Sequence, residues 1–416
     1  MAIDIRTSTP IADKTNAPSM QGAFTAILAP THDDVVAMDA PSGPWAQQAF
    51  AQDIQALANT IAASYQTHLD LSPTETQALE NTLVERLYAF AGTPGFNATP
   101  QVIANNDPEL GDRLRSQGYA SKMMDLNDPT GDGYWKFTPH TVRQETHRHG
   151  VHALRMVGQM VAADVTGYIP PCHERIEDFQ RQNDYASFVI QPDQMKALHS
   201  LKGYAEVPED QRYNLSTVTE KLVSGETALF VFDKPFFNTG GVGTTRGACL
   251  PIGQFLEPFH THNPTVMLFA DNLPHLYDIE DGGALLTLFH EGLHGVYDEG
   301  GHYHDSSPEE FLLNEYHSRY HEFKMEFGGR QTPQKMAKEF NKEFLSTVMK
   351  SGAYKSIAEE YTCNHSTLIQ ERWELVSLGW LNGKDMTPER VREILYAPSL
   401  EDAMRIARQA EPLGGQ

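Results

Sequence analysis

Two histidines and a glutamate at close spacing are the residues of this chain best suited to chemistry. His290, Glu291 and His294 form the pattern His-Glu-x-x-His within the segment 284–297. Residues four apart lie on one face of a helix, so the two imidazoles can bind one metal ion while the Glu291 carboxylate reaches a water beside it. The pattern therefore predicts a zinc site on a helix, with Glu291 as general base.

The residues around this pattern argue against a solvated surface helix. Apolar side chains surround the motif on nearly every side of the predicted helix, namely Leu285, Leu286, Leu288, Phe289, Leu293 and Val296. Burying a histidine or a carboxylate without a partner is costly, so a buried helix must pair these groups. A metal ion would supply that pairing.

A second predicted helix follows and offers the third ligand. The segment 306–310, SSPEE, is a start signal that combines a serine cap, a proline in the first turn and acids. Glu315, Ser318, Arg319 and Glu322 then recur at i, i+3, i+4 and i+7, which places them on one face. We predict that Glu315 binds the metal and that the other three orient the ligands. The alternative is a solvated polar stripe with internal ion pairs.

Taken together, residues 257–322 resemble the carboxypeptidase Taq family of zinc gluzincins. In that family a Pro-Phe segment and a strand precede the His-Glu-x-x-His helix, and Glu-x-x-Ser-Arg-x-x-Glu supplies the third ligand. This chain has Pro258-Phe259, a predicted strand at 265–270, and the second motif beginning at Glu315 with the same spacing. It departs from the family at 265–267, Thr-Val-Met, where the family strand carries an acidic and an arginine position.

The resemblance implies a mostly α-helical fold with a deep cleft and a small β-sheet next to the active-site helix. It also implies one zinc per chain, a peptide substrate trimmed from its C-terminus, and a homodimer. A carboxypeptidase needs a cation for the terminal carboxylate, and Arg372 is the weak candidate for that role. A donor must also stabilise the oxyanion, for which the unranked candidates are Tyr297, His302, Tyr303 and His365.

Other histidines fall outside this pattern. His147, His149 and His152 cluster on one predicted helix, where we expect core or surface histidines and not a second metal site. His260 and His262 lie next to the predicted strand at 265–270 and could contact substrate.

Composition excludes several classes of protein. The net charge is -23, the opposite sign from that of a typical nucleic-acid-binding protein. The chain has three cysteines without a CxxC pair, and no apolar run long enough for a membrane span. Residues 1–22 are polar, lack the apolar core of a signal peptide and are expected to be a disordered leader. We therefore expect a cytoplasmic protein, or else one exported without a cleaved signal.

Periodicity gives a coarse map of the remaining chain, which we interpret as one catalytic domain, 23–416, with two helical lobes around a cleft. Residues 93–140 are rich in Gly, Pro, Asn and Asp and are predicted to be loops. Strands are predicted at 228–236 and 265–270. Helices are predicted at 45–69, from the Ser72–Glu75 capping box to 90, at 141–165, at 174–188, and over most of the chain after 283.

Three other functions stay open at this point. A zinc endopeptidase, including one exported as an effector, would have an open-ended groove and no receptor for a terminal carboxylate. A carboxylate-bridged di-iron enzyme is disfavoured, because that class needs two Glu-x-x-His pairs and the sequence offers only Glu291-x-x-His294. A non-catalytic binding protein on a dead peptidase scaffold would have no need of the intact Glu291.

Overall fold

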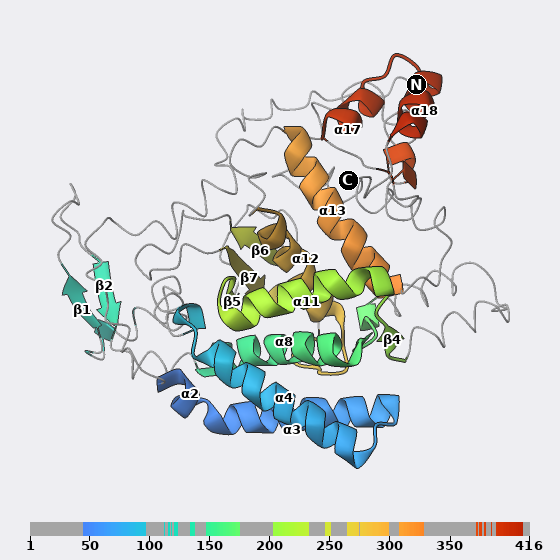
Figure 1. The fold of residues 1–416 in the computed structure, drawn as a ribbon. Coiled ribbons are helices and arrows are strands. Elements are labelled where there is room, and N and C mark those ends of the chain that lie inside the picture. Colours follow the sequence, from blue (N-terminus) through green and yellow to red (C-terminus); the bar gives the residue numbers. More distant parts are fainter. Residues whose placement is uncertain are drawn as a thin grey trace, which may run out of the picture.

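The structure is a computed structural model of the chain and is mostly helical with a small sheet, as predicted (Figure 1). It describes residues 45–96, 112, 115–116, 118, 120–123, 134–137, 147–174, 203–232, 246–250, 264–273, 275–298, 308–327, 372, 374–376, 378–379, 384 and 388–410. The predicted leader at 1–22 and nearly all of the helix predicted at 174–188 lie outside these residues.

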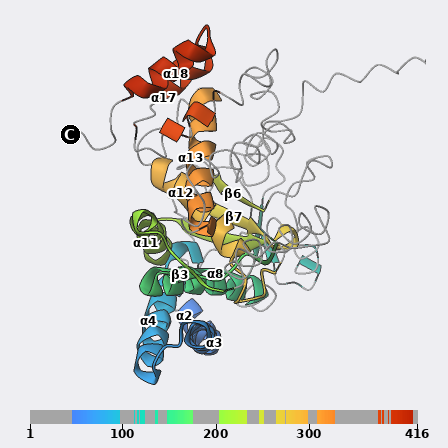
Figure 2. The ribbon, with the colours of Figure 1, turned by 90° about the vertical axis from the view of Figure 1, so that its right-hand side faces the viewer.

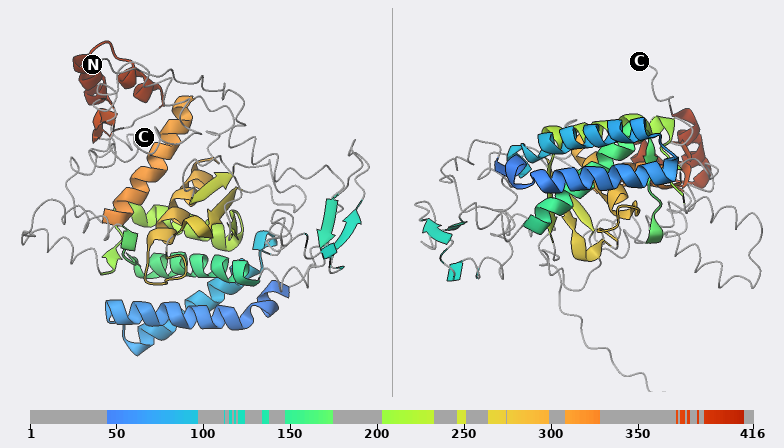
Figure 3. Two further views of the ribbon diagram at one scale, coloured as in Figure 1. Left: turned by 180° about the vertical axis from the view of Figure 1, so that it is seen from behind. Right: turned by 90° about the horizontal axis from the view of Figure 1, so that it is seen from below.

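Five helices form a layered base. They are α2 (Trp45–Ala49), α3 (Ala51–Leu69), α4 (Pro73–Ala91), α8 (His147–Thr166) and α11 (Glu209–Ser224). The capping box that starts α4 is present, with the Glu75 amide donating to Ser72 Oγ and Glu75 Oε2 accepting from the Ser72 amide. The single helix predicted at 45–69 is broken at Phe50, whose ring packs against Phe96 and His147. Seen from below, α3 and α4 cover α8 (Figure 3).

A three-stranded sheet lies on the other side of α8. Its order is β5 (Ala228–Phe232), β7 (Thr265–Phe269) and β6 (Gly247–Leu250). β5 and β7 run parallel and are buried throughout, which explains why both appear in the sequence as continuous apolar runs. β6 pairs with β7 in the antiparallel direction and ends the strand order.

The helix that carries His-Glu-x-x-His is α12 (Gly283–Asp298), and it packs against β6, β7, α8 and α11. Gly292 permits the close approach to α11, because a Cβ at this position would lie 2.4 Å from Val218 Cγ1. The next helix, α13 (Pro308–Phe327), begins at the predicted proline and packs along α12. Figure 2 shows α12 and α13 together beside the sheet. The two motif helices are therefore held against each other by a buried core.

Smaller elements complete the described chain. The region 93–140, predicted to be loops, contains β1 (Ala120–Met123) paired with β2 (Tyr134–Phe137), so that prediction was wrong for these strands. Each has only four residues and lacks a long apolar run, which explains the error. Further short elements are β3 (Tyr168–Ile169), β4 (Ala205–Glu206), η2 (Ala270–Asn272), α17 (Pro388–Leu395) and α18 (Leu400–Gln409). None of the helices within the described ranges combines the length and apolar composition needed to cross a membrane.

Candidate metal centre

The two histidines of the motif face each other on α12. His290 Nε2 and His294 Nε2 are 3.2 Å apart, and the rings meet edge to face. Two ligands bound tetrahedrally at zinc–nitrogen distances near 2.0–2.1 Å would be about 3.3 Å apart, so the observed separation fits one shared ion. His290, Glu291 and His294 together bring three metal-binding atoms within 4.8 Å of one another.

The opposite nitrogen of each imidazole is held by a side chain of α13. His294 Nδ1 lies 3.1 Å from Asn314 Oδ1 and 3.3 Å from Ser318 Oγ. His290 Nδ1 lies 3.0 Å from Glu322 Oε2. A hydrogen-bond partner at Nδ1, as His294 has, keeps the proton there and leaves the Nε2 lone pair for a metal, whereas His290 Nδ1 meets Glu322 at ion-pair distance without hydrogen-bond geometry. The predicted face of α13 therefore contacts both histidines.

Glu322 is ionised at the centre of this arrangement. Arg319 NH1 donates to Glu322 Oε2 at 2.7 Å, and the carboxylate is largely buried. Burial alone would raise the pKa of Glu322, but the Arg319 charge and the contact with His290 outweigh it and hold that pKa at about 2. Arg319 is thus linked to His290 through Glu322.

The Glu291 side chain lies between α12 and the β6 strand. It is 9% exposed, and a Cβ added at Gly247 would lie 2.7 Å from Glu291 Cγ and 3.0 Å from its Oε1. Only a glycine at this point of β6 therefore leaves room for the carboxylate in its observed position. Sequence reasoning missed Gly247, because the contact joins segments far apart in the chain.

The structure describes the other predicted site residues only in part. Glu315 lies on α13 and Tyr297 on α12, but their side chains are outside the described part of the structure. His302, Tyr303, His365, His260 and His262 also lie outside it. The Arg372 guanidinium donates to the Leu395 carbonyl at the end of α17.

Two features of α13 were not predicted. Asn314, which contacts His294, precedes Ser318 by four residues, so helical spacing could have identified it. His317 and His321 form a second pair at i and i+4, with their Nε2 atoms 3.2 Å apart and His321 Nδ1 2.7 Å from Gln211 Oε1. Burial lowers the pKa of both, to about 4 for His321, and the positive charges of His321 and His294 lower that of His317 further.

The three clustered histidines of α8 have separate partners. His147 Nε2 lies 2.8 Å from Asp53 Oδ2, His149 Nδ1 lies 2.9 Å from the Val231 carbonyl, and His152 meets the Tyr277 ring edge to face. Such divergent contacts agree with the prediction of core and surface histidines.

Comparison of the chain with family models, curated proteins and solved structures finds no match. The centre must therefore be interpreted from its own geometry and from the motif spacing.

Proposed function

We propose that the chain is a zinc-dependent peptidase in which His290, His294 and Glu315 hold the metal. The observation that carries this proposal is the pair of facing Nε2 atoms whose Nδ1 atoms both meet side chains of α13. A solvated helix with two surface histidines would not need a buried carboxylate and a buried serine behind them. Glu315 lies on α13 at i−3 from Ser318 and i−7 from Glu322, which contact the two histidines, and this shared face favours it as the third ligand.

The donor set suits zinc, which prefers imidazole and carboxylate ligands in a four-coordinate site with one open position. When bound there, zinc would polarise a peptide carbonyl and lower the pKa of a water towards about 7. Glu322 and Asn314 with Ser318 would orient the two imidazoles and raise the basicity of Nε2 toward a bound metal.

Glu291 is proposed as the general base. Its carboxylate adjoins the two facing imidazoles, where it can accept a proton from the attacking water and deliver it to the leaving amine. The contact with Gly247 limits where this carboxylate can lie. The same intact base disfavours a dead scaffold that only binds.

A peptide is the favoured substrate because Glu291 adjoins the strand at the end of the sheet order. Among the strands that the structure describes, β6 pairs with β7 alone, and an extended peptide can add to such an edge as a further strand. A substrate bound along β6 would pass directly beside Glu291. The deep cleft, the C-terminal trimming and the homodimer implied by the carboxypeptidase Taq resemblance belong to the same proposal.

One observation favours internal cleavage as the second candidate. Arg372, the arginine considered for a terminal carboxylate, already donates to the Leu395 carbonyl. An endopeptidase needs no such receptor.

The direct test is a random peptide library incubated with the full chain and read by mass spectrometry, with and without a zinc chelator. Products shortened by one residue at a time from the C-terminus would support the carboxypeptidase. Internal fragments would support the endopeptidase. Chelator-sensitive binding without any product would overturn the peptidase proposal in favour of the binding protein.

A further inference from the structure

A second group of metal-binding side chains lies at the other end of α12. His173, His275 and Asp281 each offer one ligand atom, and these atoms all lie within 4.8 Å of one another. Asp281 immediately precedes α12, His275 lies in the loop after η2, and His173 follows β3. The group therefore joins segments about a hundred residues apart in sequence.

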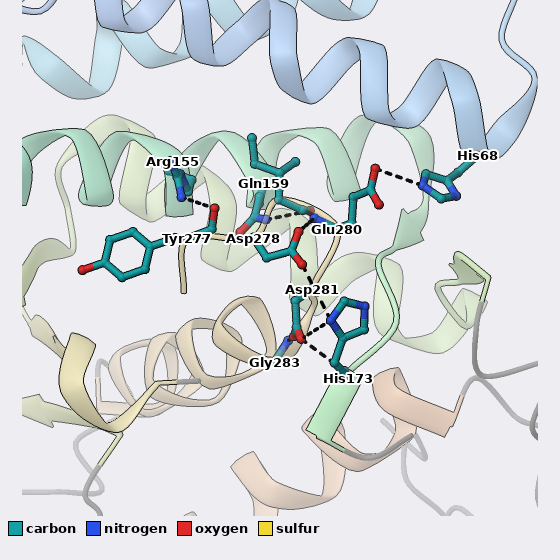
Figure 4. Close-up of polar contacts among 10 residues, drawn as sticks. His68, Arg155, Gln159, His173, Tyr277, Asp278, Glu280, Asp281 and Gly283 are labelled. Carbon is teal, nitrogen blue, oxygen red and sulfur yellow. Dashed lines mark hydrogen bonds and ion pairs between the residues drawn. The ribbon is translucent and has the colours of Figure 1, made fainter. Parts of the chain in front are cut away.

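Its shortest contact is close to a ligand-to-ligand distance. His173 Nδ1 is 3.0 Å from Asp281 Oδ2, against about 3.3 Å between two ligands of one tetrahedral zinc. A second carboxylate adds to the donors, since Asp278 Oδ2 lies 3.7 Å from the same nitrogen. Figure 4 shows both aspartates pointing from the loop toward the His173 ring.

The loop that carries these groups is held on its far side. Gln159 of α8 donates to the Ile279 carbonyl at 2.9 Å, Arg155 donates to the Tyr277 carbonyl, and His68 of α3 lies 3.4 Å from Glu280 (Figure 4). Residues 277–280 are thereby anchored to the helical base. The possible metal ligands on the opposite side of this loop are therefore carried by a backbone that is held in place.

Asp281 also has its own geometry fixed. Its Oδ1 accepts from the Gly283 amide at 2.7 Å and its Oδ2 accepts from the His173 amide at 3.2 Å. The carboxylate is 3% exposed. Burial raises the pKa of Asp281, while the Gly283 amide, His173 and His275 act to lower it. A buried carboxylate in such surroundings is stabilised by a nearby cation.

His275 completes the group from an exposed position. Its backbone has a φ of 62°, in the left-handed region that histidine adopts more readily than most residues. This conformation places the imidazole on the same side as Asp281 and His173, within ligand range. Because His275 is exposed, its side chain can close on an ion without disturbing the core.

We propose that His173, His275 and Asp281 form a second zinc-binding site, with Asp278 or water as the fourth ligand. Two imidazoles and a carboxylate form a set of ligands that binds zinc in preference to calcium or magnesium. An ion at this position would connect the segment after β3 to the start of α12. Its role would be to fix that helix, independently of any peptidase activity at the other end.

The test counts zinc per full-length chain after chelation and reconstitution with zinc, by elemental analysis. Wild type should bind about two zinc ions, while His275→Asn and His294→Ala should each bind about one and their double variant close to none. Asn adopts the left-handed conformation readily and His275 is exposed, so His275→Asn should keep the fold. His68→Ala is the matched control, since His68 contacts the same loop but is not in the donor set.

A second readout is thermal unfolding. Zinc should raise the melting temperature of His294→Ala, which keeps the proposed site, but not that of the double variant, because a ligand stabilises only the folded state that binds it. The proposal is overturned if His275→Asn binds as much zinc as wild type. It is also overturned if His68→Ala loses as much zinc as His275→Asn, since the metal would then report only the integrity of the loop.

Discussion

The two ends of α12 carry histidines and carboxylates in different kinds of arrangement. At the His290 end, both imidazoles come from one helix and their Nδ1 atoms meet partners on α13. At the Asp281 end, the donors come from two segments, His173 after β3 and the loop before α12, and the Asp281 carboxylate accepts backbone amides while it faces His173. The first arrangement holds Nε2 atoms ready for a metal, whereas the second also serves to start the helix.

This difference separates two roles that a metal can have. A catalytic centre keeps an open position and an adjacent base, and Glu291 is the base that we propose at the His290 end. A structural site instead ties together segments that are distant in sequence, as the Asp281 end would. If the two roles are separate, a change at one end of α12 should leave metal binding at the other end unaffected.

Removing the third ligand should have the largest effect at one end alone. We expect Glu315→Ala to lose the zinc of the His290 site and all peptide hydrolysis, because two imidazoles hold zinc weakly. Zinc bound at the Asp281 end should remain, which elemental analysis of the purified variant would detect. Glu326→Ala, farther along α13, is the control. Retention of wild-type turnover in Glu315→Ala would remove Glu315 from the site.

Neutralising the partner of His290 should weaken the same site without abolishing it. Glu322→Gln keeps the shape of the side chain but removes the charge that faces His290 Nδ1 and Arg319. We expect zinc affinity to fall about 10- to 100-fold, the usual cost of losing an outer partner. Competition with a chromophoric chelator measures this, with Glu326→Gln as control. An unchanged affinity would mean that the Glu322 contact does not tune the metal site.

A methyl group placed against Glu291, the proposed base, should reduce turnover while the metal stays bound. A Cβ at position 247 would lie 2.7 Å from Glu291 Cγ, so Gly247→Ala should displace the carboxylate. A displacement near 1 Å can cost about 100-fold, and we expect kcat/KM to fall about 10- to 100-fold at full zinc content. Gly203→Ala is the control, because a Cβ there meets nothing within 4 Å. Full activity of Gly247→Ala would show that the base does not depend on β6.

The last expected effect is on stability against acid, near the Asp281 end. Burial, with Arg155, His149 and Arg148, lowers the pKa of His152 from 6.5 to about 4. Below pH 6.5 the unfolded chain therefore binds a proton at His152 that the folded chain excludes. His152 does not affect the stability of the folded protein above pH 6.5, and it lowers that stability increasingly as the pH falls toward 4. Between pH 7 and 5 this loss is about 2 kcal/mol.

Urea unfolding of wild type and His152→Leu at both pH values measures this effect, and the difference between the two proteins isolates His152 from other titrating groups. The variant should lose less stability than wild type on acidification. Equal losses would show that His152 is not buried against Tyr277 as described.

The pairing of His290 with His294 could be predicted from the sequence because the two residues are close together in it. Four residues along a helix fix the separation of two imidazoles, and a serine-proline start signal fixes where α13 begins. The same rules found the capping box of α4 and the buried strands β5 and β7. Helical periodicity also grouped Ser318 and Glu322 on the face that contacts the two histidines.

Contacts that depend on packing between distant segments could not be predicted from the sequence. The contact of Gly247 with Glu291 and the convergence of His173 on Asp281 join residues with no shared periodicity. β6 was missed for a related reason, because a four-residue edge strand with glycine carries little pattern of its own. The interruption of the first helix at Phe50 was also not predicted; its backbone angles leave the helical range while hydrogen bonds continue across it.

The central claim is that Glu291 acts as a base beside zinc held by His290 and His294. The most direct measurement compares wild type and Glu291→Gln for zinc content and for hydrolysis of the same peptide library. The account predicts equal zinc content and a loss of hydrolysis of about 100- to 10,000-fold, because the amide cannot accept the proton of the attacking water. Equal hydrolysis by the two proteins, or zinc content unaffected by His290→Ala and His294→Ala, would contradict it.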